Sequence, residues 1–266
     1  MSKVIHNLTD FIFDLQSQGK RCFTIEMVRA KFTWNEEVVK KYLYRLSKKN
    51  QIVSIRKGFY LIVPPEYSHS GILPPEMFIH ELMTFLNQNY YVGLITAAMY
   101  HGASHQKPQE FFVISEEKQF RIIEKNGIRI NFITKKKLNL AGIRQIKTST
   151  GFINVSNPEM TFLDLLTYEN CIGGINRAVE LMMEINDVLS ISRFKRVIEN
   201  VPISILQRAG YIFENLLEKQ SFAEYIFSSL NDTKLYRTGL SSGVNSKGNC
   251  TNRWKVIENV KLDIER

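Results

Sequence analysis

The chain has 266 residues, of which 44% are hydrophobic and 23% are charged. This length predicts two domains or one domain with an added module, and the composition is that of a globular protein whose core needs neither disulfides nor metals. No apolar run approaches the roughly 20 residues of a membrane helix. The first residues carry acids within their apolar pattern and lack a small-residue cleavage site, which excludes a signal peptide.

The cysteines and the charge distribution indicate the cellular compartment and the kind of binding partner. Cys22, Cys171 and Cys250 are far apart and lack ligand spacing, so we expect a protein of the reducing cytoplasm. The net charge is +9; residues 1–63 hold twelve Lys and Arg against five Asp and Glu, a net of +7, and the other 203 residues hold twenty-three against twenty-one, a net of +2. A small basic module on a nearly neutral body predicts a polyanionic partner, nucleic acid before an anionic membrane surface.

The first 65 residues have the pattern of a winged helix-turn-helix. Apolar residues recur at helical spacing from Val4 to Leu15, and Gly19 is a plausible end of this helix. Thr24 is predicted to cap a short second helix that ends near Phe32. Thr33 and Glu36 have the spacing of a capping box, which predicts the start of a third helix. That helix would pack through one face and expose the other; the packing face contains Val39, Tyr42, Leu43 and Leu46.

Two short runs rich in β-branched and aromatic residues, 52–55 and 59–63, follow the third helix. Gly58 supplies the positive φ that a tight hairpin needs, and Arg56 and Lys57 place two cations at its tip. The third helix would enter the major groove of DNA while the wing reaches the neighbouring backbone. The residues predicted to contact DNA are Glu37, Lys40, Lys41, Tyr44, Arg45, Lys48, Arg56 and Lys57. Alternatively, this basic face is only solvated, or the module binds another protein.

The remaining chain predicts a larger α+β domain with a mixed sheet and a helical C-terminal part. The prolines from Pro64 to Pro75 mark a linker, so we expect a winged-helix domain over 1–65 and a second domain over 66–266, with a possible sub-boundary near 156. The predicted strands include 110–115, a hairpin at Asn126-Gly127, one or two strands over 143–156, and a final strand from Arg253. Predicted helices begin near Pro75, Gly93 and Pro158, and three more follow to about Leu230.

Catalytic and metal-binding signatures are weak. The sequence has no phosphate-binding loop, dinucleotide fingerprint, nucleophile elbow or H-E-x-x-H motif. His101 and His105 are four residues apart, but Gly102 between them breaks the shared helical face that a zinc pair needs. Glu110 stands before a strand without a second carboxylate close by. We therefore predict no catalytic residue, no metal and no cofactor. Lys135, Lys136 and Lys137 form a second basic cluster, for which DNA contact is left open.

Several segments together resemble the AbiEi family of antitoxins. They are RKGFYLIVPPEY, GILPPEMFIHELMTFL, YYVGLITAAMYHGASHQKPQEFFVIS, ILQRAGYIFENL and the RWKVIENV end. The resemblance runs from about residue 5 to the C-terminus and is most specific over 74–112. Ser104 and Lys107 depart from the expected HGAAHQQPQ pattern, and Lys107 adds a charge there. The family-motif positions, to which the family assigns no known role, are Glu76, Tyr91, Gly93, His101, Gly102, His105, Gln106 and Gln109, together with Pro75, Tyr90 and Pro108.

The resemblance implies a bacterial abortive-infection operon in which the antitoxin counteracts a nucleotidyltransferase toxin. It also implies that the winged helix binds inverted repeats in its own promoter and that no stable complex with the toxin is required. Two-fold symmetric operators make a dimer on the DNA possible. Two other hypotheses stay open: a stand-alone DNA-binding regulator with a sensing domain, and a metal-dependent nucleic-acid enzyme that uses His101, His105 and Glu110.

Overall fold

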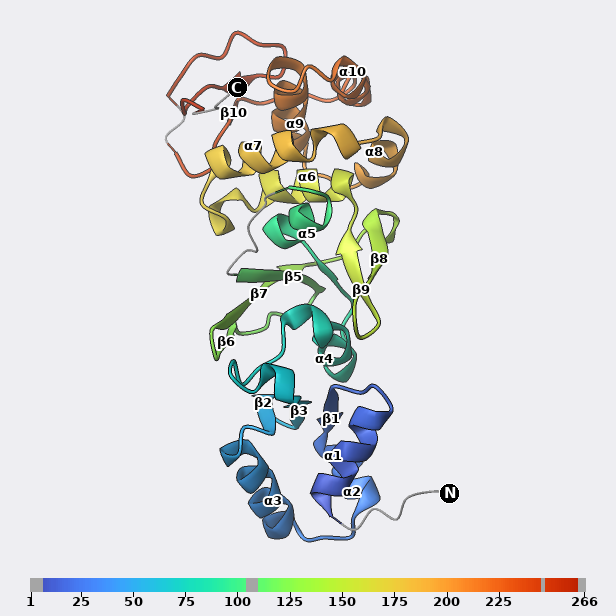
Figure 1. Ribbon diagram of the computed structural model, residues 1–266. Coiled ribbons are helices and arrows are strands. Elements are labelled where there is room, and N and C mark those ends of the chain that lie inside the picture. The colour runs from blue at the N-terminus through green and yellow to red at the C-terminus, as the bar shows by residue number, and fades with distance from the viewer. Residues whose placement is uncertain (1–6, 104–109, 245–246, 263–266) are drawn as a thin grey trace. The chain divides into compact units, whose positions relative to one another are not determined.

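The computed structural model describes residues 7–103, 110–244 and 247–262, and Figure 1 shows its helices and strands. The predicted α+β class is confirmed: a mixed six-stranded sheet follows an N-terminal set of short helices, and the C-terminal part is helical. The chain forms two compact units. The first unit comprises residues 1–90, 109–138 and 145–154, and the second comprises 91–108, 139–144 and 155–266.

The borders of these units differ from the expected domain borders. The boundary expected after residue 65 lies inside the first unit, because residues 66–90 and 109–138 cluster with the N-terminal residues. That residues 1–65 form a separate domain therefore stays a prediction. The sub-boundary expected near residue 156 lies beside the border between residues 154 and 155.

The N-terminal elements have the order of a winged helix. A three-stranded antiparallel sheet of order β1-β3-β2 packs with three helices around a common core. Rings from successive elements meet edge to face in this core, with centroids 6.0 Å apart for Phe11 and Phe23 and for Phe11 and Phe32. The elements are α1 (Leu8–Ser17), β1 (Cys22–Thr24), α2 (Ile25–Lys31), α3 (Glu36–Lys48), β2 (Ile52–Arg56) and β3 (Phe59–Ile62).

The predicted caps of these helices were partly wrong. Thr24 caps α2 as predicted, since its hydroxyl accepts a hydrogen bond from the Met27 N–H. Asn35, and not Thr33, is the N-cap of α3: its side-chain oxygen accepts from the Val38 N–H at 2.9 Å. Asparagine caps at least as well as threonine, so the helix begins two residues later than the capping box predicts. The first strand, β1, was not predicted at all, and the start of the first helix at Val4 lies outside the described residues.

The large sheet has the strand order β6-β7-β5-β4-β9-β8. β5 and β7 pair in parallel, and β6 and β7 form the predicted hairpin. Asn126 and Gly127 at its turn have φ values of 47° and 79°, as a type I′ turn requires. β4 was missed because its three buried residues run directly into the next helix. The strands are β4 (Tyr90–Val92), β5 (Glu110–Glu116), β6 (Ile123–Lys125), β7 (Ile128–Lys135), β8 (Ile143–Lys147) and β9 (Phe152–Ser156).

Pro75 begins a single 3-10 turn, Pro75–Met77, and the helix predicted there starts later as α4 (Ile79–Phe85). Most other helices belong to the second unit, where α6 is almost wholly buried and contacts α5, α7, α8 and α9. Its N-terminus is as predicted, with Asn157 as the cap and Pro158 first in the helix. These helices are α5 (Leu94–Tyr100), α6 (Pro158–Thr167), α7 (Ile175–Glu184), α8 (Ile191–Val197), α9 (Ile203–Asn215) and α10 (Gln220–Ser229).

In its described residues, the C-terminal segment forms a short parallel pair, β10 (Thr238–Gly239) and β11 (Val256–Ile257), and an isolated bridge between Asn249 and Glu258. The long final strand predicted from Arg253 is not formed there. The anchor of this segment is Trp254, whose side chain is fully buried. The ring lies against Gly210 of α9 so closely that a Cβ there would stand 2.2 Å from it. Among the described residues, no helix is both long and apolar enough to traverse a bilayer.

Candidate nucleic-acid interface and the histidine site of the second unit

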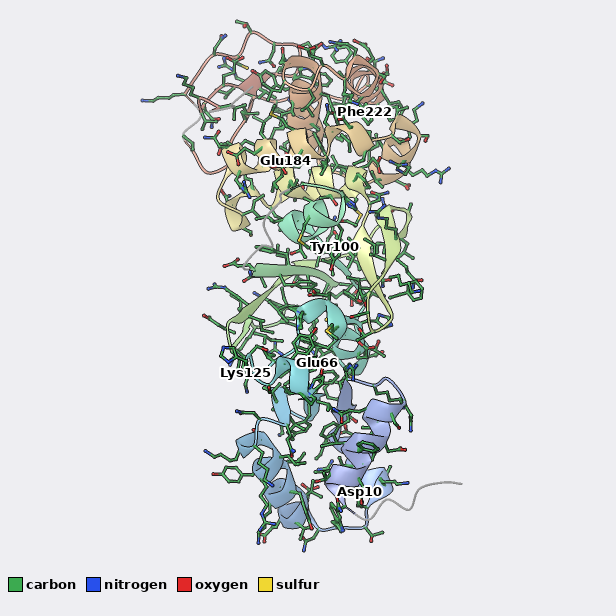
Figure 2. The ribbon with its side chains drawn as sticks, in the orientation of Figure 1. Asp10, Glu66, Tyr100, Lys125, Glu184 and Phe222 are labelled. Atoms are coloured by element: carbon green, nitrogen blue, oxygen red, sulfur yellow. The ribbon has the colours of Figure 1, made fainter. Side chains whose placement is uncertain are left out.

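α3 presents the basic face that its sequence predicts. Val39, Leu43 and Leu46 are buried against the winged-helix core. The opposite side of the helix is solvent-exposed, and Figure 2 includes its side chains. Tyr44 is 63% exposed, and the Lys48 Nζ lies 5.5 Å from the centroid of its ring. The exposed predicted DNA contacts on this helix are Glu37, Lys40, Lys41, Tyr44, Arg45 and Lys48.

An aromatic stack that was not predicted from the sequence stiffens the turn before α3. The Trp34 ring stacks on Phe32 with centroids 4.0 Å apart and on Tyr42 with centroids 4.8 Å apart. Because Phe32 is the C-cap of α2 and Tyr42 lies on α3, the stack joins the two helices. The aromatic residues at 32, 34 and 42 were the available signal, but their pairing depends on the turn geometry.

The wing tip places its two cations differently. Lys57 is exposed, whereas Arg56 is half-buried and donates from Nη2 to the backbone oxygen of Arg121. The Arg56 guanidinium also lies 5.7 Å from the ring centroid of Phe132. Burial, with the charge of Arg121, lowers the pKa of Arg56. Of the two residues, Lys57 is the exposed one, as a phosphate contact would need.

The second basic cluster follows β7. Lys135 is half-buried, and Lys136 and Lys137 are exposed. Glu116 organises this exit, because its carboxylate accepts from the Leu138 N–H at 3.0 Å and from Asn89 Nδ2 at 2.7 Å. These two hydrogen bonds lower the pKa of Glu116. The lysine cluster thus lies at an ordered strand end. Whether it contacts DNA stays open and requires a binding measurement.

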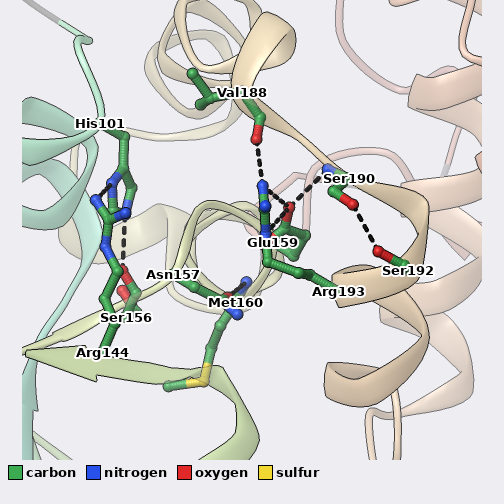
Figure 3. Close-up of polar contacts among 10 residues, drawn as sticks. All are labelled: His101, Arg144, Ser156, Asn157, Glu159, Met160, Val188, Ser190, Ser192 and Arg193. Carbon is green, nitrogen blue, oxygen red and sulfur yellow. Dashed lines mark hydrogen bonds and ion pairs between the residues drawn. The ribbon is translucent and has the colours of Figure 1, made fainter.

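His101 is the centre of a buried polar site in the second unit (Figure 3). Its Nε2 is 2.7 Å from the backbone oxygen of Ser156, which can only accept, so Nε2 carries the proton. Nδ1 then accepts from Arg144 Nη2, also at 2.7 Å. Neither ring nitrogen is therefore presented to a metal. The expectation that His101 holds the turn after α5 agrees with these contacts, which connect it to the start of α6.

We expect this histidine to make stability depend on pH. Burial, followed by the charge of Arg144, lowers the pKa of His101 from 6.5 to about 4. Between pH 6.5 and about 4, His101 is protonated in the unfolded chain but neutral in the folded chain. Stability is therefore lost as pH falls from about 6.5 towards 4. Between pH 6.5 and 5 the free energy of unfolding should fall by about 1.5 kcal/mol more in the unaltered protein than in the His101→Gln variant. The glutamine stays neutral over this range and can keep both hydrogen bonds. Urea unfolding at several pH values measures this, and parallel curves for the two proteins would contradict it.

Beside the histidine, the first turn of α6 buries a second charged group. The Glu159 side chain is fully buried, and its carboxylate accepts from the Ser190 N–H at 2.7 Å. Arg193 Nε lies 3.1 Å from both carboxylate oxygens, and its Nη2 donates to the Val188 carbonyl (Figure 3). These contacts join α6 to the start of α8. Their arrangement is that of a structural ion pair in which each group has a partner.

The other family-motif residues are mostly buried packing positions. The Tyr91 hydroxyl donates to Asp164 Oδ2 at 2.7 Å, and burial followed by this carboxylate raises the pKa of Tyr91. Gly93 is the buried N-cap of α5, and Gly102 has a φ of 97°, a left-handed conformation that glycine tolerates. Glu76 is half-buried in the 3-10 turn before α4. Four motif residues lie outside the described residues: His105, Gln106, Pro108 and Gln109.

A buried ion pair in the helical part was missed entirely from the sequence. Arg208 Nη2 lies 2.9 Å from Glu169 Oε2, with side chains 3% and 0% exposed. The guanidinium also donates to the carbonyls of Leu240 at 2.9 Å and Leu166 at 3.1 Å. Each residue stands on an ordinary helical segment, so no local pattern signals their pairing. Together with Trp254, this pair attaches the C-terminal segment to α9.

One hollow of about 460 Å³ is found in the first unit, lined by residues from α4, β4 and β9. Its polar groups bond to one another: the Tyr90 hydroxyl is 3.2 Å from His80 Nδ1, and Asn154 Nδ2 donates to the Tyr90 carbonyl.

Glu110, the carboxylate of the enzymatic hypothesis, accepts from Asn131 Nδ2 at 2.7 Å. In the part of the chain that the structure describes, no three His, Cys, Asp or Glu side chains come together as metal ligands.

Comparison with known proteins supports the resemblance for one part of the chain. Residues 91–215 match the family model described as the AbiEi antitoxin C-terminal domain. The match begins at Tyr91, where the second unit begins, and it supports an antitoxin role in a toxin–antitoxin system. The N-terminal winged helix lies outside it.

A solved structure extends the comparison to the whole fold. The chain is similar to the RV2827C protein from Mycobacterium tuberculosis, with a TM-score of 0.67 and 13% sequence identity. The similarity covers 93% of this chain and 89% of that chain, and at this identity it shows the fold alone. No curated protein matches the sequence.

Proposed function

We propose that this protein is the antitoxin and transcriptional autorepressor of a bacterial abortive-infection toxin–antitoxin operon. The observation that carries the DNA-binding half is the solvent-exposed basic face of α3 on a winged-helix scaffold. The family match of residues 91–215 supports the antitoxin half. The fold of the first unit supplies the helix that recognises DNA, and the second unit supplies the surface that counteracts the toxin.

In this proposal α3 enters the major groove of promoter DNA. Lys40, Lys41 and Lys48 neutralise phosphates, while Tyr44 and Glu37 lie near base edges, where a carboxylate can accept from a cytosine amino group. Lys57 at the wing contacts the neighbouring backbone. Because the promoter sites are inverted repeats, two copies of the chain bind with matching two-fold symmetry.

The toxin in this proposal is a nucleotidyltransferase, and its antagonism requires no stable complex with the antitoxin. The second unit contains buried polar contacts between its own residues, such as those of His101, Glu159 and Arg208. These groups hold the helices in place, so the surface that opposes the toxin is formed by the exposed residues around them.

Co-expression tests both halves at once. We expect the full chain, expressed from an independent promoter, to protect cells from the product of the adjacent gene. A Lys41→Ala/Tyr44→Ala/Lys48→Ala variant should protect equally, because these exposed side chains support no core contact, yet it should no longer repress a reporter placed behind the operon promoter. Cell survival and reporter output are the measurements.

Two results would contradict the proposal. If the adjacent gene encodes no toxic product, or if the full chain does not protect against it, the antitoxin assignment fails. If the triple variant represses as well as the unaltered chain, the assignment of α3 to DNA recognition fails. The variant's far-UV circular dichroism and urea midpoint serve as the folding control.

A further inference from the structure

The wing of the winged helix is held by the hairpin formed by β6 and β7. Lys125 at the end of β6, labelled in Figure 2, donates from Nζ to the Ser54 carbonyl of β2 at 2.9 Å. On the same side, Arg56 donates to the Arg121 carbonyl and lies over the Phe132 ring. We call these contacts, with the one made by Asn126 described below, the wing clamp. Its hydrogen bonds connect residues that are 55 to 71 positions apart in the sequence, within one compact unit.

The hairpin turn also holds the segment that links the wing to α4. Asn126 Nδ2 donates to the Gly71 carbonyl at 3.0 Å. The approach is close, because a Cβ on Gly71 would lie 2.9 Å from that same nitrogen. α4 adds an apolar contact: the Phe85 ring lies 5.4 Å from the Phe59 ring of β3. The wing and the segment that follows it are therefore both held by residues that come later in the sequence.

The contacts with the β6–β7 hairpin and α4 indicate that the wing does more than bind phosphates. Arg56 Nη2 donates to the Arg121 carbonyl, the guanidinium lies over the Phe132 ring, and the Ser54 carbonyl accepts from Lys125. We propose that the β6–β7 hairpin is a positioning element, which orients the winged helix for DNA through the wing clamp without touching DNA itself. The inference rests on the proposed DNA-binding function, which it deepens by assigning a role to residues outside the winged helix.

The expected benefit of such positioning is preorganisation. Binding of two winged helices to two half-sites depends on how closely their orientations match the DNA before contact, since orienting them on the DNA costs affinity. Releasing the clamp should leave every phosphate contact of α3 in place and lower the affinity. Lys125 is the discriminating residue, because a lysine that contacts phosphate and one that only positions the wing differ in the salt dependence of binding.

The test uses the full-length protein and a duplex that carries the DNA upstream of its own gene. In the Lys125→Met/Asn126→Gly variant, the Lys125 stem is kept and Gly-Gly still forms a type I′ turn, so the hairpin persists while both hydrogen bonds are lost. We expect binding to weaken roughly three- to tenfold, the low end of what two hydrogen bonds contribute because both are exposed, with an unchanged slope of log K against log salt. Lys147→Met removes one exposed lysine from β8 and is the matched control.

Each outcome decides the inference. A slope reduced by about one unit would make Lys125 a direct phosphate contact and overturn the positioning role. Unchanged affinity would overturn it as well. Asn126→Gly alone, which alters no charge, should weaken binding in the same direction, and amide exchange at residues 54–58 of the free protein should become faster. If the unaltered chain does not prefer the upstream duplex to an unrelated one, the proposed function itself fails, and this inference with it.

Discussion

The Lys41→Ala/Tyr44→Ala/Lys48→Ala variant should bind the upstream duplex roughly 100-fold more weakly than the unaltered protein. Two lysines are lost from phosphates, which should also reduce the salt slope by about two units. In the proposed complex, Tyr44 would contact a base or sugar through a side chain that is 63% exposed in the free protein. Gel shifts at three salt concentrations measure both quantities.

The second unit offers a matched control for this variant. Lys234 Nζ lies 5.4 Å from the ring centroid of the 68% exposed Tyr236, which reproduces the Lys48 and Tyr44 pair in distance and exposure. A Lys234→Ala/Tyr236→Ala/Lys247→Ala variant removes the same residue types from a surface with no assigned DNA contact. It should bind the duplex as the unaltered protein does. Equal losses in both variants would mean that general charge, and not the α3 face, drives binding.

Arg208→Met should cost about 3 to 5 kcal/mol of unfolding free energy. The change leaves the fully buried Glu169 carboxylate without its cation and removes the donors to the Leu240 and Leu166 carbonyls. A loss of this size is a large share of the stability of an ordinary domain, so antitoxin activity should fall with it. Urea unfolding of the full chain measures the change.

A double variant and a surface control make that prediction sharper. In Arg208→Met/Glu169→Gln the buried charge is gone, so much of the lost stability should return. Arg177 and Glu180 form an exposed pair on α7, with 2.8 Å between Nη1 and Oε2. Arg177→Met should therefore cost well under about 1 kcal/mol. If Arg177→Met and Arg208→Met cost the same, burial does not set the strength of the Arg208 pair.

The elements that could be predicted from the sequence are those whose signal is local. Asn126-Gly127 between alternating runs specified a hairpin, and Asn157-Pro158 specified the start of α6, because turn and cap chemistry acts over two to four residues. The amphipathic pattern of α3 likewise separated its buried and exposed faces. The error at Thr33 was also local: two competing caps stood two residues apart, and Asn35 had the better geometry.

What could not be predicted depends on contacts between distant residues. Arg56 had every feature of a wing-tip phosphate contact, yet its environment is set by Arg121 and Phe132. The pairing of Glu169 with Arg208 and the burial of Trp254 against Gly210 join segments about 40 residues apart. The nitrogens of His101 first suggested ligand chemistry, and only their partners Ser156 and Arg144 reveal a packing role. In each case the residue type was visible in the sequence and its neighbour was not.

The burial of Trp254 also sets an order of events during synthesis. The last segment of the first unit ends at residue 154, whereas the core of the second unit stays open until Trp254 is made and packs on α9. At typical translation rates of about 5 to 20 residues per second, those 100 residues take roughly 5 to 20 s. Every residue of the first unit, to which we assign DNA recognition, is therefore synthesised before Trp254. A chain that ends in this interval would contain every residue of the first unit and would lack the tryptophan that packs on α9.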